Sequence, residues 1–152
     1  AFVDARLVQS RQQLMTAIVQ AVVGAMRRDP KRPGAEVGLK TPSIHSDLLW
    51  TLHSNNNIAE ALRRFGVSRT TRTLILVRVA PPLDAGELVQ HMSQLVDGTL
   101  QTHGLSLPSP ALAWSELGTA YKIQDTPAFQ HPDTSQVDAL ICSMVASKYV
   151  GA

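Results

Sequence analysis

Three consecutive asparagines, residues 55–57, follow Ser54 at the start of a short amphipathic segment. An asparagine amide offers two N–H donors and one carbonyl acceptor, so it can cap a helix, build a turn or bind the edge of a nucleotide base. One asparagine is enough to start a helix. The helix start does not require Asn55 and Asn56, so we expect either a functional role for them or a plain Asx turn.

The segment after the asparagines is predicted to be a complete helix over residues 58–65. Asn57 is the expected N-cap, and Glu60 stands where its carboxylate can return a bond to the cap amide. Gly66 is expected to end the helix in the left-handed conformation. Four residues at helical spacing form its apolar face: Ile58, Ala61, Leu62 and Phe65.

Positive charge is concentrated in one third of the chain. Residues 27–78 contain ten of the fourteen Lys and Arg but only four acids, a balance of +6, and the remainder carries four bases against eight acids, or −4. This asymmetry favours a polyanionic partner for one face, and a solvated loop with a polar helix face is the alternative. Arg27, Arg28, Lys31 and Arg32 are expected to add non-specific attraction.

Signatures of catalysis are missing from the sequence. The five histidines have no metal-ligand spacing, and there is neither a glycine-rich phosphate loop nor a G-x-S-x-G motif. A hidden site at His53, Asn55 and Asn56 is the least favoured alternative. We therefore expect no catalytic residue, metal, cofactor or small-molecule substrate. Cys142 is expected to be a buried apolar residue, and no apolar run approaches the roughly 20 residues that span a membrane.

Hydrophobic periodicity predicts alternating helices and strands. The expected helices cover residues 4–28, 58–65, 84–96 and 114–123, with a last helix capped by Thr134, and the expected strands cover residues 48–52 and 73–80. The second strand is nearly all apolar and is predicted to be central and buried on both faces. These elements predict an α/β fold, a single domain over residues 1–152 with a small mixed sheet covered by helices.

Two of these helices carry long apolar stripes. The first is expected to bury Leu7, Leu14, Met15, Ile18, Val19, Val22, Val23 and Met26. The last is expected to bury Val137, Leu140, Ile141, Met144 and Val145.

The order of these segments resembles the PRPK-binding protein family, the small regulatory subunits of the KEOPS/EKC complex. Residues 47–65, DLLWTLHSNNNIAEALRRF, resemble the family's strand, Asn-rich turn and helix. Residues 3–21 resemble its long helix, residues 115–123 (SELGTAYKI) its Glu-x-x-x-x-Tyr-Lys helix, and residues 137–150 its closing helix. Because the chain begins at Ala1 and lacks the family's first strand and helix, we expect its N-terminal part to be missing. The loop over residues 28–41 is longer than expected.

The resemblance implies a binding protein rather than an enzyme. The family's partners are a PRPK-type atypical kinase/ATPase and tRNA, including its 3′ CCA end, in the formation of threonylcarbamoyladenosine next to the anticodon. It also implies a nuclear and cytoplasmic location, a link to telomere maintenance and no membrane partner.

The expected contact residues form two groups. The kinase-binding group is Ile58, Leu140, Met144 and Tyr149, for which burial in the core is the alternative. The tRNA-binding group is Lys40, Thr41, Asn55, Asn56, Arg63 and Arg64. Two other functions stay open: a free-standing small RNA-binding domain without a kinase partner, and an enzyme with an unrecognised pocket.

Overall fold

The computed structural model describes residues 1–27, 31, 38–81, 84–101 and 107–150. Arg28 and Arg32, expected to attract a polyanion, lie outside this part of the chain. The described elements are β1 (Phe2–Asp4), the 3-10 helix η1 (Ala5–Leu7), α1 (Arg11–Met26), α2 (Ile44–Leu52), α3 (Ile58–Phe65), β2 (Leu74–Leu76), α4 (Ala85–Ser93), α5 (Trp114–Tyr121), α6 (Pro127–Gln130) and α7 (Thr134–Ala146).

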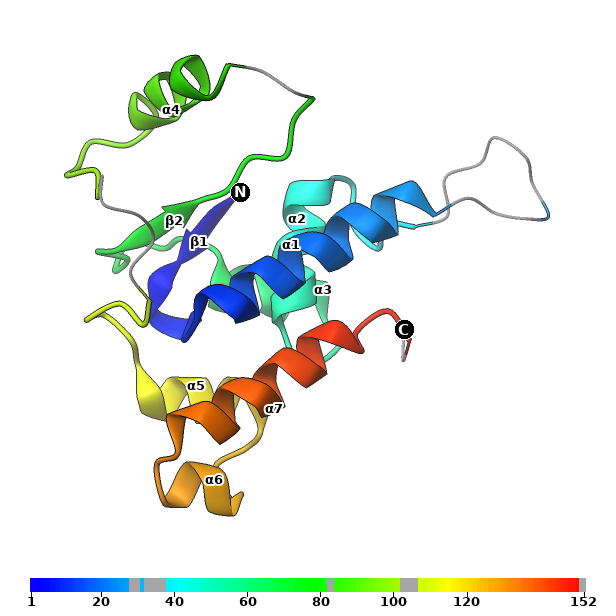
Figure 1. The fold of residues 1–152 in the computed structure, drawn as a ribbon, viewed down its shortest axis with the longest axis vertical. Helices are drawn as coiled ribbons and strands as arrows, with labels where there is room; N and C mark the ends of the chain where they lie inside the picture. Colours follow the sequence, from blue (N-terminus) through cyan, green and yellow to red (C-terminus); the bar gives the residue numbers. More distant parts are fainter. Residues whose placement is uncertain (28–30, 32–37, 82–83, 102–106, 151–152) are drawn as a thin grey trace.

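Helix α1 is the central element of the fold. It packs against α2 and α7, and Figure 1 shows it crossing the middle of the molecule above α3 and α7. The small sheet lies beside its N-terminal end, and α4 stands apart, beyond the sheet (Figure 1). Helix α4 buries none of its residues, which fits this separate position.

The predicted fold class, a small sheet with helices packed around it, is confirmed. The described sheet has two strands, β1 and β2, which run antiparallel with Val3 opposite Ile75. It is therefore antiparallel rather than mixed. Strand β2 is also shorter than the predicted strand over residues 73–80. Only Ile75 is buried in it, with 9% of its surface exposed, so β2 is not a central strand buried on both faces.

The predicted strand over residues 48–52 is wrong, because these residues form the second half of α2. The Ser43 side chain caps this helix by accepting from the Ser46 amide at 3.1 Å, and the Ser46 hydroxyl accepts from the Ser43 amide at 3.2 Å. All six residues from Asp47 to Leu52 are buried. A helix that is buried on every side lacks the regularly spaced polar residues of an exposed face. Its apolar run therefore resembles that of a buried strand.

Helix α1 begins later than predicted and faces the core with a different side. Asp4 caps η1 by accepting from the Arg6 amide, whereas Ser10 caps α1. The side of α1 toward α2 and α7 carries small residues, which allow the helices to approach closely. The predicted burial is wrong for four large residues, which remain 43–71% exposed: Met15, Val19, Val23 and Met26.

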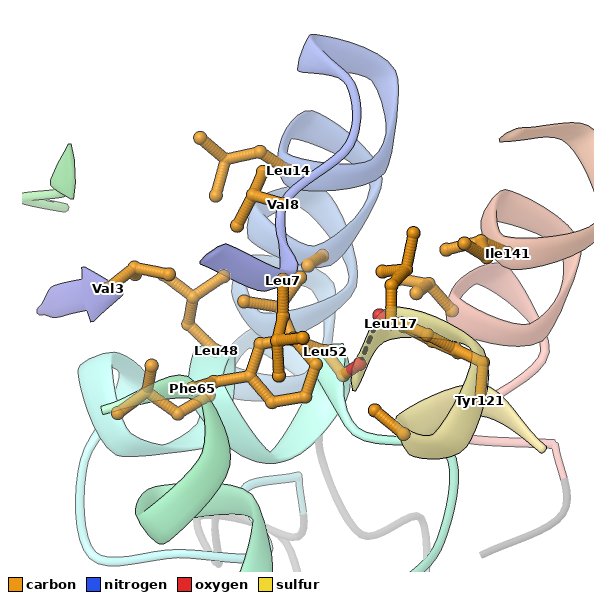
Figure 2. Packing of buried hydrophobic residues seen from close by; sticks show 14 of the residues in the cluster. Val3, Leu7, Val8, Leu14, Leu48, Leu52, Phe65, Leu117, Tyr121 and Ile141 are labelled. Carbon is orange, nitrogen blue, oxygen red and sulfur yellow. Dashed lines mark hydrogen bonds between the residues drawn. The ribbon is translucent and has the colours of Figure 1, made fainter. Parts of the chain in front are cut away.

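The core is tied together by one buried polar network. The Gln13 side chain of α1 donates to the Leu7 carbonyl at 3.0 Å and to the Tyr121 hydroxyl at 2.8 Å. The Tyr121 hydroxyl in turn donates to the Leu52 carbonyl at the end of α2 (Figure 2). Burying these groups is tolerated because each has found a partner, and the network fixes α5 against α1 and α2.

The last helix lies close to its predicted bounds. Its N-cap is Asp133 rather than Thr134, because the Asp133 carboxylate accepts from the Ser135 and Gln136 amides. Val137, Ile141 and Val145 are buried as predicted, and Leu140 and Met144 are partly buried against the core. Within the described residues, no helix is both long and apolar enough to span a membrane.

Candidate functional site

The Asn-rich turn forms as predicted around Asn57, but its partners differ. The Asn57 side chain caps α3 by accepting from the Glu60 amide at 3.1 Å, which confirms the predicted N-cap. The Asn57 amide donates to Asn55 Oδ1 at 2.8 Å, so the predicted return bond from Glu60 to that amide is wrong. Gly66 ends the helix at a φ of −76°, outside the left-handed region that was predicted.

The two asparagines that the helix does not need have different roles. Both ends of the Asn55 amide are occupied, because Oδ1 accepts from the Asn57 amide and Nδ2 donates to Glu60 Oε2 at 3.1 Å. Asn55 therefore builds the Asx turn. Asn56 is exposed at the tip, and its side-chain amide makes no hydrogen bond to any described residue. Asn56 is the asparagine that is free to bind an external group.

Glu60 organises the charges on α3. Its carboxylate accepts from Arg64 Nε at 2.9 Å, while the nearest guanidinium nitrogen of Arg63 lies at 3.9 Å. Hydrogen bonds from Asn55 and Arg64 hold the pKa of Glu60 below its usual value. The Arg63 side chain is 72% exposed, against 25% for Arg64. Arg63 is thus the more available cation for a phosphate.

His53 supports the turn from beneath. Its side chain is buried against the Phe65 ring, and its Nδ1 accepts from the Asn55 amide at 3.1 Å. Its Nε2 has no hydrogen-bond partner among the described residues and lies 3.9 Å from Glu60 Oε1. Burial lowers the pKa of His53, which keeps the ring neutral at physiological pH. A buried neutral ring bonded to the backbone fits a structural role.

The two predicted contacts before α2 differ in accessibility. The Lys40 side chain is exposed, and its backbone amide donates to Asp47 Oδ1 at 2.8 Å. Thr41 is only 8% exposed, and its hydroxyl donates to the Ser43 carbonyl at 3.0 Å. Lys40 can therefore reach a ligand through its side chain, whereas the Thr41 side chain belongs to the first turn of α2.

The residues expected to bind a kinase do not share one exposed surface. Ile58 is 37% exposed at the start of α3, and Leu140 and Met144 of α7 are partly buried against the core. Tyr149 is 7% exposed, its ring lies 5.3 Å from that of Trp50, and its hydroxyl donates to Asp47.

An exposed face of α1 was missed in the sequence. Met15, Val19, Val23 and Met26 recur on its outer side at i, i+4, i+8 and i+11, and we call these four residues the α1 face. No charged residue occurs between Arg11 and Arg27. A shallow hollow beside the face is lined by Gln12, Met15, Thr16, Val19 and Gln20. The sequence signal that could have revealed this face is a helix with apolar residues around more of its circumference than one core can cover.

Lys148 was also missed, because nothing in its local sequence marks it. It follows α7 and is 7% exposed, and its Nζ donates to the His53 carbonyl at 2.7 Å and to the Asn55 carbonyl. It therefore connects the end of the chain to the Asn-rich turn across more than 90 residues. In the described part of the chain, no group of three or more His, Cys, Asp or Glu side chains is arranged to hold a metal ion.

Comparison with known proteins gives a consistent family match. Residues 1–149 match the family described as "Kinase binding protein CGI-121". The EKC/KEOPS complex subunit CGI121 of Gibberella zeae is 38% identical over 105 residues, which cover 64% of this chain and 49% of that protein. The corresponding Aspergillus terreus subunit is 33% identical over 101 residues, covering 65% and 47%. The Neurospora crassa subunit is 26% identical over 172 residues, covering 96% and 77%. The chain thus spans about half the length of the first two relatives.

Proposed function

The chain belongs to the CGI-121 family of kinase-binding proteins, and we propose that it is a non-catalytic KEOPS/EKC subunit that binds the PRPK-type kinase and helps to capture tRNA. The family match carries the first half of this proposal, because the family description states kinase binding and the relatives are named as subunits of that complex. A nuclear and cytoplasmic location belongs to the same proposal.

The kinase is proposed to bind the α1 face. Interface centres are depleted of charge and enriched in methionine, and the α1 face has two methionines and no charged residue among them. Its side chains are 43–71% exposed, whereas the α7 candidates Leu140 and Met144 are partly buried. Met144 remains a candidate for the margin of this interface, because α7 packs against α1. Ile58 on α3 remains a candidate for a separate contact, and Tyr149 can act only from within the fold.

The tRNA is proposed to bind at the Asn-rich turn. Asn56 offers a free amide of the kind that pairs with a base edge, and the 3′ CCA end provides unpaired bases. Lys40 and Arg63 are exposed cations for backbone phosphates. Arg64 contributes through its ion pair with Glu60, which fixes the turn, while Asn55 and Thr41 shape the backbone.

Size-exclusion chromatography with the cognate PRPK-type kinase tests the proposal. We expect an equimolar complex that elutes earlier than either protein alone. If a folded chain forms no complex with the kinase, the kinase half of the proposal is wrong. The second candidate function, a free-standing RNA-binding domain, would then be favoured by the exposed Lys40, Asn56 and Arg63. The chain's helical circular dichroism spectrum is the control for folding.

A further inference from the structure

The end of α7 places a buried cation against the backbone of the Asn-rich turn. Lys148 Nζ donates to two carbonyl oxygens, those of His53 and Asn55, and lies 4.5 Å from the centroid of the Trp50 ring. The two carbonyls bracket Ser54, so the ammonium fixes the path by which the chain leaves α2 and enters the turn. A group with several donors is suited to hold two carbonyls at once.

The next residue holds a second segment in the same way. The Tyr149 hydroxyl donates to Asp47 Oδ2, and Asp47 Oδ1 accepts from the backbone amides of Lys40 and Thr41 at 2.8 and 2.9 Å. Asp47 is fully buried, so this carboxylate depends on those donors. Tyr149 therefore fixes, through Asp47, the backbone from which the Lys40 side chain projects.

We infer that Lys148 and Tyr149 are positioning residues that hold the Asn-rich turn and the Lys40 segment in one fixed arrangement for RNA binding. The inference rests on the proposed tRNA-binding function, since both segments carry its proposed contacts. Neither residue touches the RNA. Lys148 sets the backbone of the turn that presents Asn56, and Tyr149 sets the backbone of Lys40.

The energetics of Lys148 favour placement over simple core packing. Burial disfavours the charged form and lowers the pKa of Lys148 to about 8. A methionine of similar length would fill the same space without this desolvation cost. The ammonium also lies over the Trp50 ring, whose other neighbour is the Tyr149 ring, packed edge-on against it. The hydrogen bonds to the His53 and Asn55 carbonyls hold the ammonium in this position.

The test compares Lys148→Met with Lys122→Met. Lys122 is exposed after α5, so its replacement removes the same charge without touching the turn. Amide hydrogen exchange is measured for each variant, together with binding of a single-stranded RNA oligonucleotide that ends in CCA. In Lys148→Met we expect faster exchange of the Asn55 and Asn57 amides and unchanged exchange in α5. We also expect its RNA affinity to fall about tenfold relative to Lys122→Met, because hydrogen bonds from a charged donor are lost.

Tyr149→Phe keeps the ring and removes only the hydroxyl, so it tests the second segment even if Lys148→Met fails to fold. We expect faster exchange of the Lys40 and Thr41 amides in this variant and weaker RNA binding. Wild-type exchange at these amides, or local loosening with unchanged RNA affinity, would overturn the inference. If wild-type protein itself does not bind the oligonucleotide, the proposed RNA function is wrong, while localised exchange changes would still establish that the two residues hold these segments.

Discussion

The Lys148 ammonium nitrogen lies 2.7 Å from the main-chain oxygen of His53, although the two residues are 95 positions apart in the chain. This contact joins the C-terminal end of α7 to the segment that presents Asn56. It makes the exposed turn depend on a residue in the interior, and it connects the proposed tRNA-binding site to the helical core.

The first prediction concerns the α1 face. Val19→Glu places a charge at the centre of this exposed face, so it should abolish co-elution with the kinase while leaving the melting temperature within a few degrees of wild type. Val89→Glu on α4 is the matched control, because both valines are 52% exposed. If Val19→Glu still forms the complex, the kinase binds elsewhere. Loss of binding in both variants would show that the effect is not specific to α1.

The second prediction separates the two excess asparagines. Asn56→Ala should weaken binding of CCA-ended RNA about tenfold and leave stability unchanged, because its amide bonds to no described residue. Asn55→Ala removes the acceptor for the Asn57 amide and the donor to Glu60, so it should cost about 1 kcal/mol of unfolding free energy. Urea denaturation and RNA titration measure both effects. Equal RNA affinity for Asn56→Ala and wild type would remove Asn56 from the site.

The helix signals that are local in sequence were predictable. The N-caps at Asn57, Asp84 and Ser10 each accept from backbone amides within three residues along the chain. Asn57 was predicted as an N-cap, and the helix over residues 84–96 was predicted to begin at Asp84. The enclosed helix α2 was misread because burial on all sides removes the polar period on which the distinction between helix and strand depends.

The tertiary part of the site was not predictable for a different reason. Nothing within ten residues of Lys148 indicates that its ammonium will meet the carbonyls of His53 and Asn55. Helix α1 packs against α2 and α7 with the side that carries the small buried residues Ala17, Ala21 and Gly24. The α1 face is exposed because it lies on the other side of the helix. A pattern of apolar residues does not reveal that small side chains will be preferred over large ones at a close helix crossing.

The third prediction concerns Gly24 of α1, which lies against the Tyr149 side chain. A Cβ atom at Gly24 would lie 2.5 Å from the Tyr149 hydroxyl oxygen, so Gly24→Ala should destabilise the protein by about 1–3 kcal/mol, despite the higher helix propensity of alanine. Gly98→Ala is the control, because its Cβ would meet its nearest neighbour at an ordinary 3.8 Å. Thermal denaturation compares them. A Gly24→Ala protein as stable as wild type would show that Tyr149 is not held tightly against α1.

The fourth prediction concerns pH. The pKa of Lys148 is lowered to about 8 by burial, whereas an unfolded lysine titrates near 10.5. Between these values the unfolded chain binds more protons, so stability should rise with pH above 8, by about 1 kcal/mol between pH 7.5 and 9. Burial raises the pKa of the Cys142 thiol to about 11, which opposes part of this rise from about pH 8 upward, where the thiol of the unfolded chain begins to ionise.

The difference between wild type and Lys148→Met isolates the lysine in that experiment. The pKa of His53 is lowered, so its ring stays neutral throughout this range. The pKa values of Tyr121 and Tyr149 are raised, so both hydroxyls stay neutral below pH 10. Urea denaturation at pH 7.5, 8.25 and 9 should therefore give a rising curve for wild type relative to the variant. Parallel curves for the two proteins would show that the Lys148 ammonium is not desolvated in the fold.

The proposed capture of the tRNA 3′ end at the Asn-rich turn can be tested by one binding measurement. The affinity of the protein is measured for an intact tRNA and for the same tRNA without its terminal CCA, at one fixed salt concentration, because phosphate contacts are salt-dependent. We predict that removing CCA weakens binding about tenfold or more, since the bases that Asn56 would contact are lost. Equal affinity for the two tRNAs would contradict the claim.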